Sequence, residues 1–172
     1  MINWFKKQNR IDVSDINVLY SPMNGKLIDI KDVNDKTFSS GIMGRGIAII
    51  PDSNLISAPI EGEIIMIFPT KHAIGIKGNN GCELIIHIGI DTVELKGEYF
   101  DCKVKLGDLV KPGQPLVDVQ MNKIRAKGYD TSTMLVITNS NEFDINQLTT
   151  NSLIIKSEKL LSIVRKGNTI EN

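Results

Sequence analysis

The sequence predicts an all-β protein, and two features of its 172 residues carry that prediction. From Val18 onward, short apolar runs alternate with turn residues, which is typical of a β-sandwich or barrel. One short motif also occurs twice, which favours a duplicated unit folded onto itself over an open repeat array. The length suits one sizeable core. We therefore expect a flexible segment at residues 1–17, a single domain at 18–166 and a tail at 167–172.

The composition is that of an ordinary globular chain, with 41% hydrophobic and 23% charged residues and a net charge of zero. This balance predicts no nucleic-acid partner. No apolar run approaches the roughly 18 residues that span a bilayer, and the N-terminus lacks the apolar core of a secretion signal. Cys82 and Cys102 form neither a CxxC nor a zinc quartet. We expect reduced thiols and a cytoplasmic location.

The N-terminal segment has one feature of its own. Trp4 and Phe5 precede Lys6, Lys7 and Arg10. Disorder is the default for such a terminus, but a short helix on a membrane surface is the alternative. Weak membrane contact by residues 1–10 therefore stays open.

The repeated motif spans Ser21–Ile28 and Ala58–Ile65, offset by 37 positions (58 − 21). Each copy reads small residue, proline, apolar, polar, glycine, charged, apolar, apolar. Gly25 and Gly62 are expected to take positive φ in turns. An apolar strand follows each copy, at residues 46–50 and 73–76.

The second half of the chain continues the pattern of strands and turns. The expected elements are turn–strand–turn–strand at 104–119, a helical turn at 122–127, a strand at 133–138, a polar turn at 139–142 and strand–turn–strand within 153–164.

The stretch Thr70–Thr92 contains the only two histidines and reads as a β-hairpin. If Asn79 and Asn80 form a two-residue loop, His72 lies directly opposite His87, with Cβ atoms about 5 Å apart. The same register places Thr70 opposite Gly89.

Strand alternation then separates two faces of this hairpin. The core face is expected to carry Leu84, Ile86, Ile88 and Ile90. The other face is expected to carry both histidines, flanked by Ile74 and Ile85.

Two adjacent neutral imidazoles suit metal binding, acid–base chemistry or transfer of a phosphoryl group. A metal site normally needs a third protein ligand, and Asp91 lies too far along the strand. A hydrolase needs a nucleophile or an oxyanion site, and only Thr70 is near.

The segment Gly81–Gly97 resembles the signature of the glucose-type IIA proteins of the bacterial phosphoenolpyruvate-dependent sugar phosphotransferase system. Phe68–Ala73 is similar to that family's second-histidine segment, and Gly44–Ile49 and both Pro-x-x-Gly copies also match. The resemblance implies an antiparallel β-sandwich with Greek-key and jelly-roll connections, built as a duplicated hybrid motif.

The resemblance also implies roles for four residues. His87 would accept a phosphoryl group on Nε2 from the carrier protein HPr and pass it to a IIB domain. His72 would hydrogen-bond that group, Thr70 would orient His72, and the Gly89 carbonyl would hold His87 Nδ1. No cofactor is expected beyond the covalent phosphoryl group on His87, and other permeases or enzymes are possible regulatory targets.

An apolar surface around the histidines would dock these partners. To Ile74 and Ile85 the resemblance adds Phe38, Ile42, Met43, Phe68 and Val93. Asp35, Asp91 and Glu94 would ring this surface with negative charge. No resident metal is expected, although His72 and His87 could share zinc in a complex with a partner.

Two alternatives come from other classes. Gly107–Leu116 resembles the hairpin segments of biotinyl and lipoyl carrier domains, and Met121-Asn122-Lys123 loosely approaches their Met-Lys pattern. A zinc hydrolase on a related β fold is the other alternative, although the chain has few histidines for one.

Overall fold

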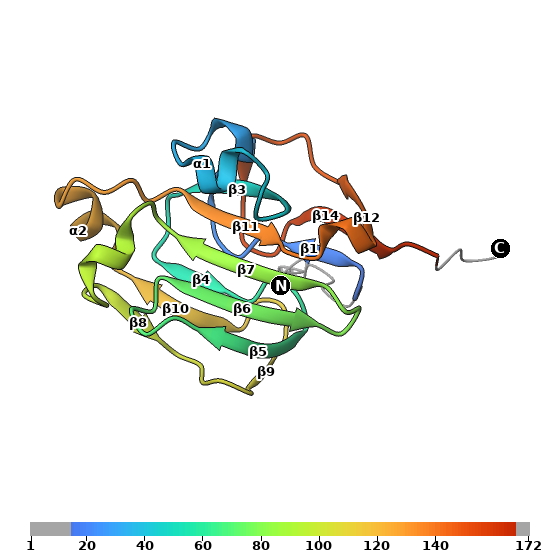
Figure 1. The fold of residues 1–172 in the computed structure, drawn as a ribbon. Coiled ribbons are helices and arrows are strands. Elements are labelled where there is room, and N and C mark those ends of the chain that lie inside the picture. Colours follow the sequence, from blue (N-terminus) through green and yellow to red (C-terminus); the bar gives the residue numbers. More distant parts are fainter. Residues whose placement is uncertain (1–14, 168–172) are drawn as a thin grey trace, which may run out of the picture.

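The computed structural model describes residues 15–167 and shows the predicted antiparallel β architecture (Figure 1). Its strands are β1 (Val18–Tyr20), β2 (Gly25–Ile28), β3 (Arg45–Pro51), β4 (Leu55–Ser57), β5 (Gly62–Ile67), β6 (Ala73–Gly78), β7 (Glu83–Ile88), β8 (Phe100–Cys102), β9 (Leu109–Val110), β10 (Pro115–Val119), β11 (Thr133–Ile137), β12 (Phe143–Gln147), β13 (Leu153–Ile154) and β14 (Lys159–Arg165). The helices are short: α1 (Lys36–Ser39), α2 (Met121–Ala126) and the 3₁₀ turns η1 (Ile30–Asp32), η2 (Thr92–Leu95) and η3 (Ser140–Glu142).

Three sheets build the sandwich. The largest has the strand order β13-β2-β3-β11-β7-β6-β5-β9, and two three-stranded sheets have the orders β1-β14-β12 and β4-β10-β8. One core cluster joins all three, because it contains Ile86 of β7, Ile56 of β4, Val117 of β10 and Ile163 of β14. The small sheets therefore pack on one face of the large sheet, and β4 and β10 lie behind β6 and β7 in Figure 1.

Strand β7 shows the predicted alternation. Leu84, Ile86 and Ile88 are buried in the main core, while Ile85 and His87 lie on the opposite face and are half-buried. Ile90, beyond the end of the strand, packs instead in a second cluster on that opposite face. That cluster contains residues of η1, α1, β3 and β11, namely Ile30, Val33, Phe38, Ala48, Met134 and Val136. The segment with η1 and α1 thus covers β11, which lies beside β7, and β3, which lies beyond β11.

The duplication predicted from the repeated motif is present as two equivalent hairpins. The first copy lies on β2 and pairs with β3, and the second lies on β5 and pairs with β6. The equivalence extends to the flanking strands, because Gly25 pairs with Ile154 of β13 as Gly62 pairs with Val110 of β9. These partners are 44 positions apart (154 − 110), a second repeat offset that was not predicted from the sequence.

The two motif glycines do not take positive φ, so that expectation is wrong. A Cβ atom on Gly25 would lie 2.3 Å from the carbonyl oxygen of Ile50, and one on Gly62 would lie 2.1 Å from that of Lys77. Both glycines are therefore required by the close approach of a neighbouring backbone.

The loop between β6 and β7 also differs from the expected two-residue turn. Gly78 N donates to Cys82 O at 2.8 Å, Gly81 N donates to Gly78 O at 2.8 Å, and Gly81 has φ +85°. This is the geometry of a three-residue loop that ends in a left-handed glycine. The register shifts by one residue as a result, so that Ala73 lies opposite His87.

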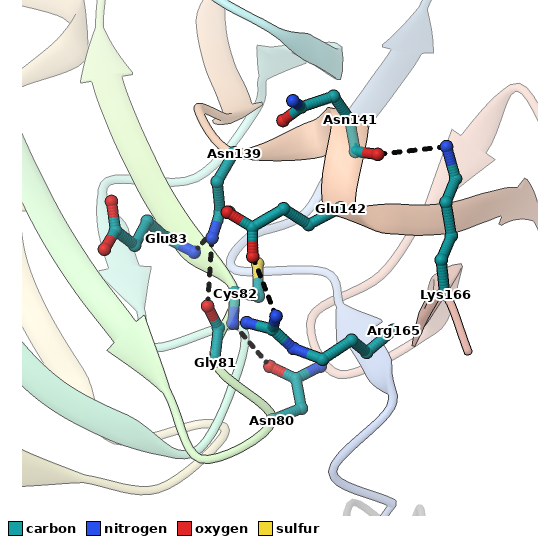
Figure 2. A network of polar contacts seen from close by, with 9 residues as sticks. All are labelled: Asn80, Gly81, Cys82, Glu83, Asn139, Asn141, Glu142, Arg165 and Lys166. Carbon is teal, nitrogen blue, oxygen red and sulfur yellow. Dashed lines mark hydrogen bonds and ion pairs between the residues drawn. The ribbon is translucent and has the colours of Figure 1, made fainter. Parts of the chain in front are cut away.

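A polar network ties this loop to β14 and η3 (Figure 2). Asn139 is its centre, because its side chain accepts a hydrogen bond from Glu83 N and donates one to Gly81 O, both at 3.0 Å. Asn80 adds a bond to the backbone of β14, donating to Ile163 O at 3.2 Å. Arg165 of β14 pairs with Glu142 at 2.8 Å. The loop that sets the register of β7 is thus held by side chains from distant segments.

We expect Asn139→Ala to lower the free energy of unfolding by about 1–3 kcal/mol, because it leaves two backbone groups without their partner. Equilibrium urea unfolding measures the loss. Asn141→Ala is the matched control, since only the backbone carbonyl of Asn141 accepts a bond from Lys166. Equal stability losses in the two variants would contradict this role.

Candidate functional site

His87 lies near the end of β7, between β6 and β11, where its neighbours across the ladder are Ala73 and Met134. Its Nδ1 lies 2.9 Å from the carbonyl oxygen of Gly89. A carbonyl oxygen only accepts hydrogen bonds, so Nδ1 carries the proton of the neutral ring. The lone pair of the imidazole is therefore on Nε2, the nitrogen available for chemistry.

His72 reaches His87 from a turn and not from a paired strand. The turn is closed by hydrogen bonds from Lys71 N to Phe68 O (2.7 Å) and from Phe68 N to Ala73 O (3.0 Å), and Lys71 takes φ +58°. The two histidine rings come within 4.9 Å of each other, centroid to centroid, at an interplanar angle of 83°. The predicted meeting of the rings is confirmed, although the predicted direct pairing of the two residues is wrong.

Thr70 lies in the same turn and contacts His72. Thr70 Oγ1 is 2.6 Å from His72 Nδ1. If the hydroxyl donates, Nδ1 is the unprotonated nitrogen and Nε2 of His72 carries the proton. The predicted pairing of Thr70 with Gly89 across a ladder is wrong, because β6 begins only at Ala73.

Aromatic rings enclose the histidine pair. The Phe38 ring centroid lies 4.8 Å from that of His87, and the Phe68 ring meets His72 edge-on at 5.2 Å. A mainly apolar depression of about 530 Å³ opens here, lined by Asp35, Thr37, Phe38, Met43, Met66, Phe68, His72, Ala73, Ile85, His87 and Val93.

Burial sets the charge of both imidazoles. Burial, and to a smaller extent the neighbouring His87, lower the pKa of His72 from 6.5 to about 4. Burial also lowers the pKa of His87, against the opposing effects of the Gly89 carbonyl and then of the Asp35 and Asp91 carboxylates. Both rings are therefore neutral near pH 7.

Of the predicted docking residues, Asp35, Phe38, Met43, Phe68, Ile85 and Val93 line the depression. The placement of Ile74 on this face is wrong: its side chain is 1% exposed and belongs to the main core, because the one-residue register shift turns it inward. Ala73 takes its place beside His87.

The other three predicted docking residues lie outside the lining of the depression. Ile42 is 82% exposed, next to Met43 on the loop after α1. Asp91 and Glu94 are exposed in and before η2. Their contact with partners stays a prediction.

Three lining residues were not predicted from the sequence, namely Thr37, Met66 and Ala73. Met66 faces the depression because β5 bulges between Ile64 and Met66. No residue in that stretch of sequence indicates a bulge. The position of Ala73 could have been predicted, because small residues alternate with isoleucines along β6 and the isoleucines are expected to face the core.

The two alternatives from other classes have little support in the described residues. Lys123 lies in α2, with its Nζ 5.8 Å from the Tyr99 ring centroid, and not at the tip of a hairpin as a biotinyl or lipoyl carrier requires. Across residues 15–167 no group of three or more His, Cys, Asp or Glu side chains is placed to hold a metal ion. The same range contains no helix long and apolar enough to cross a membrane.

Comparison with known proteins points to one family. A family model described as phosphoenolpyruvate-dependent sugar phosphotransferase system, EIIA 1, matches residues 17–143. The glucose-specific EIIA component of Halalkalibacterium halodurans is 44% identical over 140 residues, which are 81% of this chain and 81% of that protein. The beta-glucoside-specific EIIBCA component of Bacillus subtilis is 39% identical over 146 residues, which are 85% of this chain but only 24% of that larger protein.

A solved structure agrees with these relatives. Glucose permease IIA from Mycoplasma capricolum superposes with a TM-score of 0.73 at 30% identity, covering 85% of this chain and 94% of that one. Neither the fold nor the relatives favour a biotinyl or lipoyl carrier or a zinc hydrolase. The chain belongs to the EIIA family of the phosphoenolpyruvate-dependent sugar phosphotransferase system and is thus a phosphotransferase component.

Proposed function

We propose that this chain is a phosphocarrier whose His87 Nε2 accepts a phosphoryl group from HPr and passes it to a IIB domain. The observation that carries the proposal is the hydrogen bond from His87 Nδ1 to Gly89 O, which leaves the lone pair on Nε2. The new bond joins Nε2 to phosphorus while the bond from phosphorus to the donor breaks. Nδ1 keeps its proton throughout, so transfer at this ring needs no general base.

His72 is suited to stabilise the transferred group. With the Thr70 hydroxyl donating to His72 Nδ1, Nε2 of His72 carries a proton that it can donate to a phosphoryl oxygen. Transfer of a phosphoryl group depends on positioning and charge stabilisation more than on covalent help from the protein. Thr70 would act through His72 as a positioning residue.

The downward shift of the pKa of both rings supports this chemistry. A protonated His87 would have no lone pair to attack phosphorus, and burial favours the neutral ring near pH 7. The aromatic wall formed by Phe38 and Phe68 would exclude water from the bound group, which slows its hydrolysis.

The rim of the depression fits docking partners that bring basic and apolar side chains. Asp35 lines it, and the carboxylates of Asp35 and Asp91 are close enough to His87 to act on its pKa. Partners that carry arginine would be steered by this charge. The relatives whose names join EIIA to EIIB and EIIC support a IIB domain as the acceptor.

We place this exchange in the cytoplasm. Regulatory partners are further candidates for the same surface. The predicted membrane contact of residues 1–10 lies outside the described residues.

We expect His87→Ala to abolish labelling in an assay with radiolabelled phosphoenolpyruvate, Enzyme I and HPr, because the attacking nitrogen is gone. His72→Gln should still be labelled but should pass the group to a IIB domain more slowly, on the order of a hundredfold. Onward rates equal to those of the wild type would contradict the role of His72, and labelling of His87→Ala would contradict the whole proposal.

We also expect Val93→Ala to raise the KM for phospho-HPr up to about tenfold, which corresponds to about 1.4 kcal/mol of docking energy. Val93 is 43% exposed and lines the depression, so it can be truncated without opening the core. Leu109→Ala is the control, because Leu109 is 78% exposed on the edge strand β9. Steady-state labelling rates measure the KM of each variant, and identical values would exclude Val93 from the docking surface.

Finally, acid should destabilise the chain through His72. Its pKa is 6.5 when unfolded and about 4 when folded, so between these values the unfolded chain binds more protons. The free energy of unfolding therefore falls as pH falls from 6.5 towards 4. Its slope against pH reflects the uptake of at most one proton by this group. Urea unfolding at pH 7 and pH 4.5 should show a smaller loss in His72→Gln than in the wild type, and parallel losses would mean that His72 does not titrate in this way.

A further inference from the structure

We propose that Thr92 and Asp130 are positioning residues that hold His87 in its reactive tautomer by clamping the peptide between Gly89 and Ile90. This inference rests on the proposed phosphocarrier function and adds to it the groups that fix the Gly89 carbonyl. Neither side chain has a hydrogen bond to an imidazole, so both act through the backbone.

The clamp is a property of a single peptide plane. The carbonyl of Gly89 and the N–H of Ile90 belong to one planar trans unit and point in opposite directions. On one side, the carbonyl accepts from His87 Nδ1 at 2.9 Å. On the other side, Ile90 N donates to Asp130 O at 2.9 Å. The position of the Asp130 carbonyl therefore sets the direction of the Gly89 carbonyl.

Asp130 stiffens the loop that supplies this acceptor. Its carboxylate accepts a hydrogen bond from Ser132 N at 2.7 Å. The same loop holds the preceding amide, because Gly89 N donates to Ser132 O at 3.0 Å. One exposed carboxylate thus organises both backbone carbonyls that hold the residues after His87.

Thr92 holds the segment from inside. It is fully buried, and its hydroxyl donates to the carbonyl of Ile88. Its methyl group fills the space at Gly89, where an added Cβ would lie 2.4 Å from Thr92 Cγ2. The segment needs such support, because Gly89 and Asp91 both take positive φ, +76° and +58°. A non-glycine residue in that conformation persists only where its surroundings over-determine it.

The consequence for His87 concerns its tautomer. Which ring nitrogen carries the proton is set by the hydrogen bond that the other makes. If the Gly89 carbonyl turns away, Nδ1–H loses its acceptor and the tautomer with the proton on Nε2 gains population. That tautomer has no lone pair at the nitrogen that attacks phosphorus.

The test is long-range proton–nitrogen NMR of the His87 ring near pH 8, without a phosphoryl donor. We expect the wild type and Thr92→Ser to show a proton on Nδ1, because both keep the hydroxyl. Thr92→Val, which keeps the shape but loses the donor, should show a mixture of tautomers and label about tenfold more slowly. Thr149→Val is the control, since Thr149 is also buried and its hydroxyl donates to Glu158, in another part of the chain.

Asp130→Ala and Asp130→Asn form a second pair that does not depend on a buried site. The alanine variant should shift the tautomer as Thr92→Val does, while the asparagine variant, which keeps an acceptor oxygen, should behave as the wild type. An unchanged His87 tautomer in Thr92→Val and Asp130→Ala would overturn the clamp, even if labelling still requires His87. A shifted tautomer with labelling at another residue would instead overturn the proposed function.

Discussion

The pairing of β6 with β7 is the constraint on which the site depends. Strand side chains alternate between faces, so a slip of one residue would exchange every side chain of β6 between the core and the depression. In the observed register, Ile74 and Ile76 fill the core while Ala73 and Gly75 lie on the opposite face, beside His87 and Ile85. Small residues there leave room for the second imidazole. The three-residue loop that ends at Gly81 selects this register, and the Asn139 network holds the loop in place.

Burial and neutrality are linked in the same region. The depression is mainly apolar, and a charged imidazole would have to give up its hydration there. The histidines therefore remain neutral, which is the state in which one ring can attack phosphorus and the other can donate a hydrogen bond. Asp35 and Asp91 oppose this effect at His87 without cancelling it. In the proposed function, this balance would keep His87 nucleophilic while the carboxylates beside it would attract basic partners.

The sequence was sufficient for the fold class, for the core face of β7 and for the meeting of the two histidines. It was not sufficient for the register, because Gly78-Asn79-Asn80-Gly81 is compatible with loops of two or three residues, and only the closed ladder distinguishes them. The inward position of Ile74 follows from the pairing of β6 with β7, and the bulge that presents Met66 follows from the pairing of β5 with β6. The glycines of the repeat were predicted at the right places for the wrong reason, since what matters there is the approach of a neighbouring strand and not a turn.

The duplication also explains why the depression opens on only one of two equivalent surfaces. When the ladders of the two halves are matched, Ala73 is equivalent to Gly46 and His87 is equivalent to Val136. Val136 is sealed beneath the long connection between β2 and β3, which carries η1 and α1, whereas the short connection between β5 and β6 leaves His87 open. Both connections then converge, since the long one supplies Phe38 and the short one supplies His72. The two halves thus differ in the length of one connection, and the additional residues of the longer connection form a wall of the depression beside the other half.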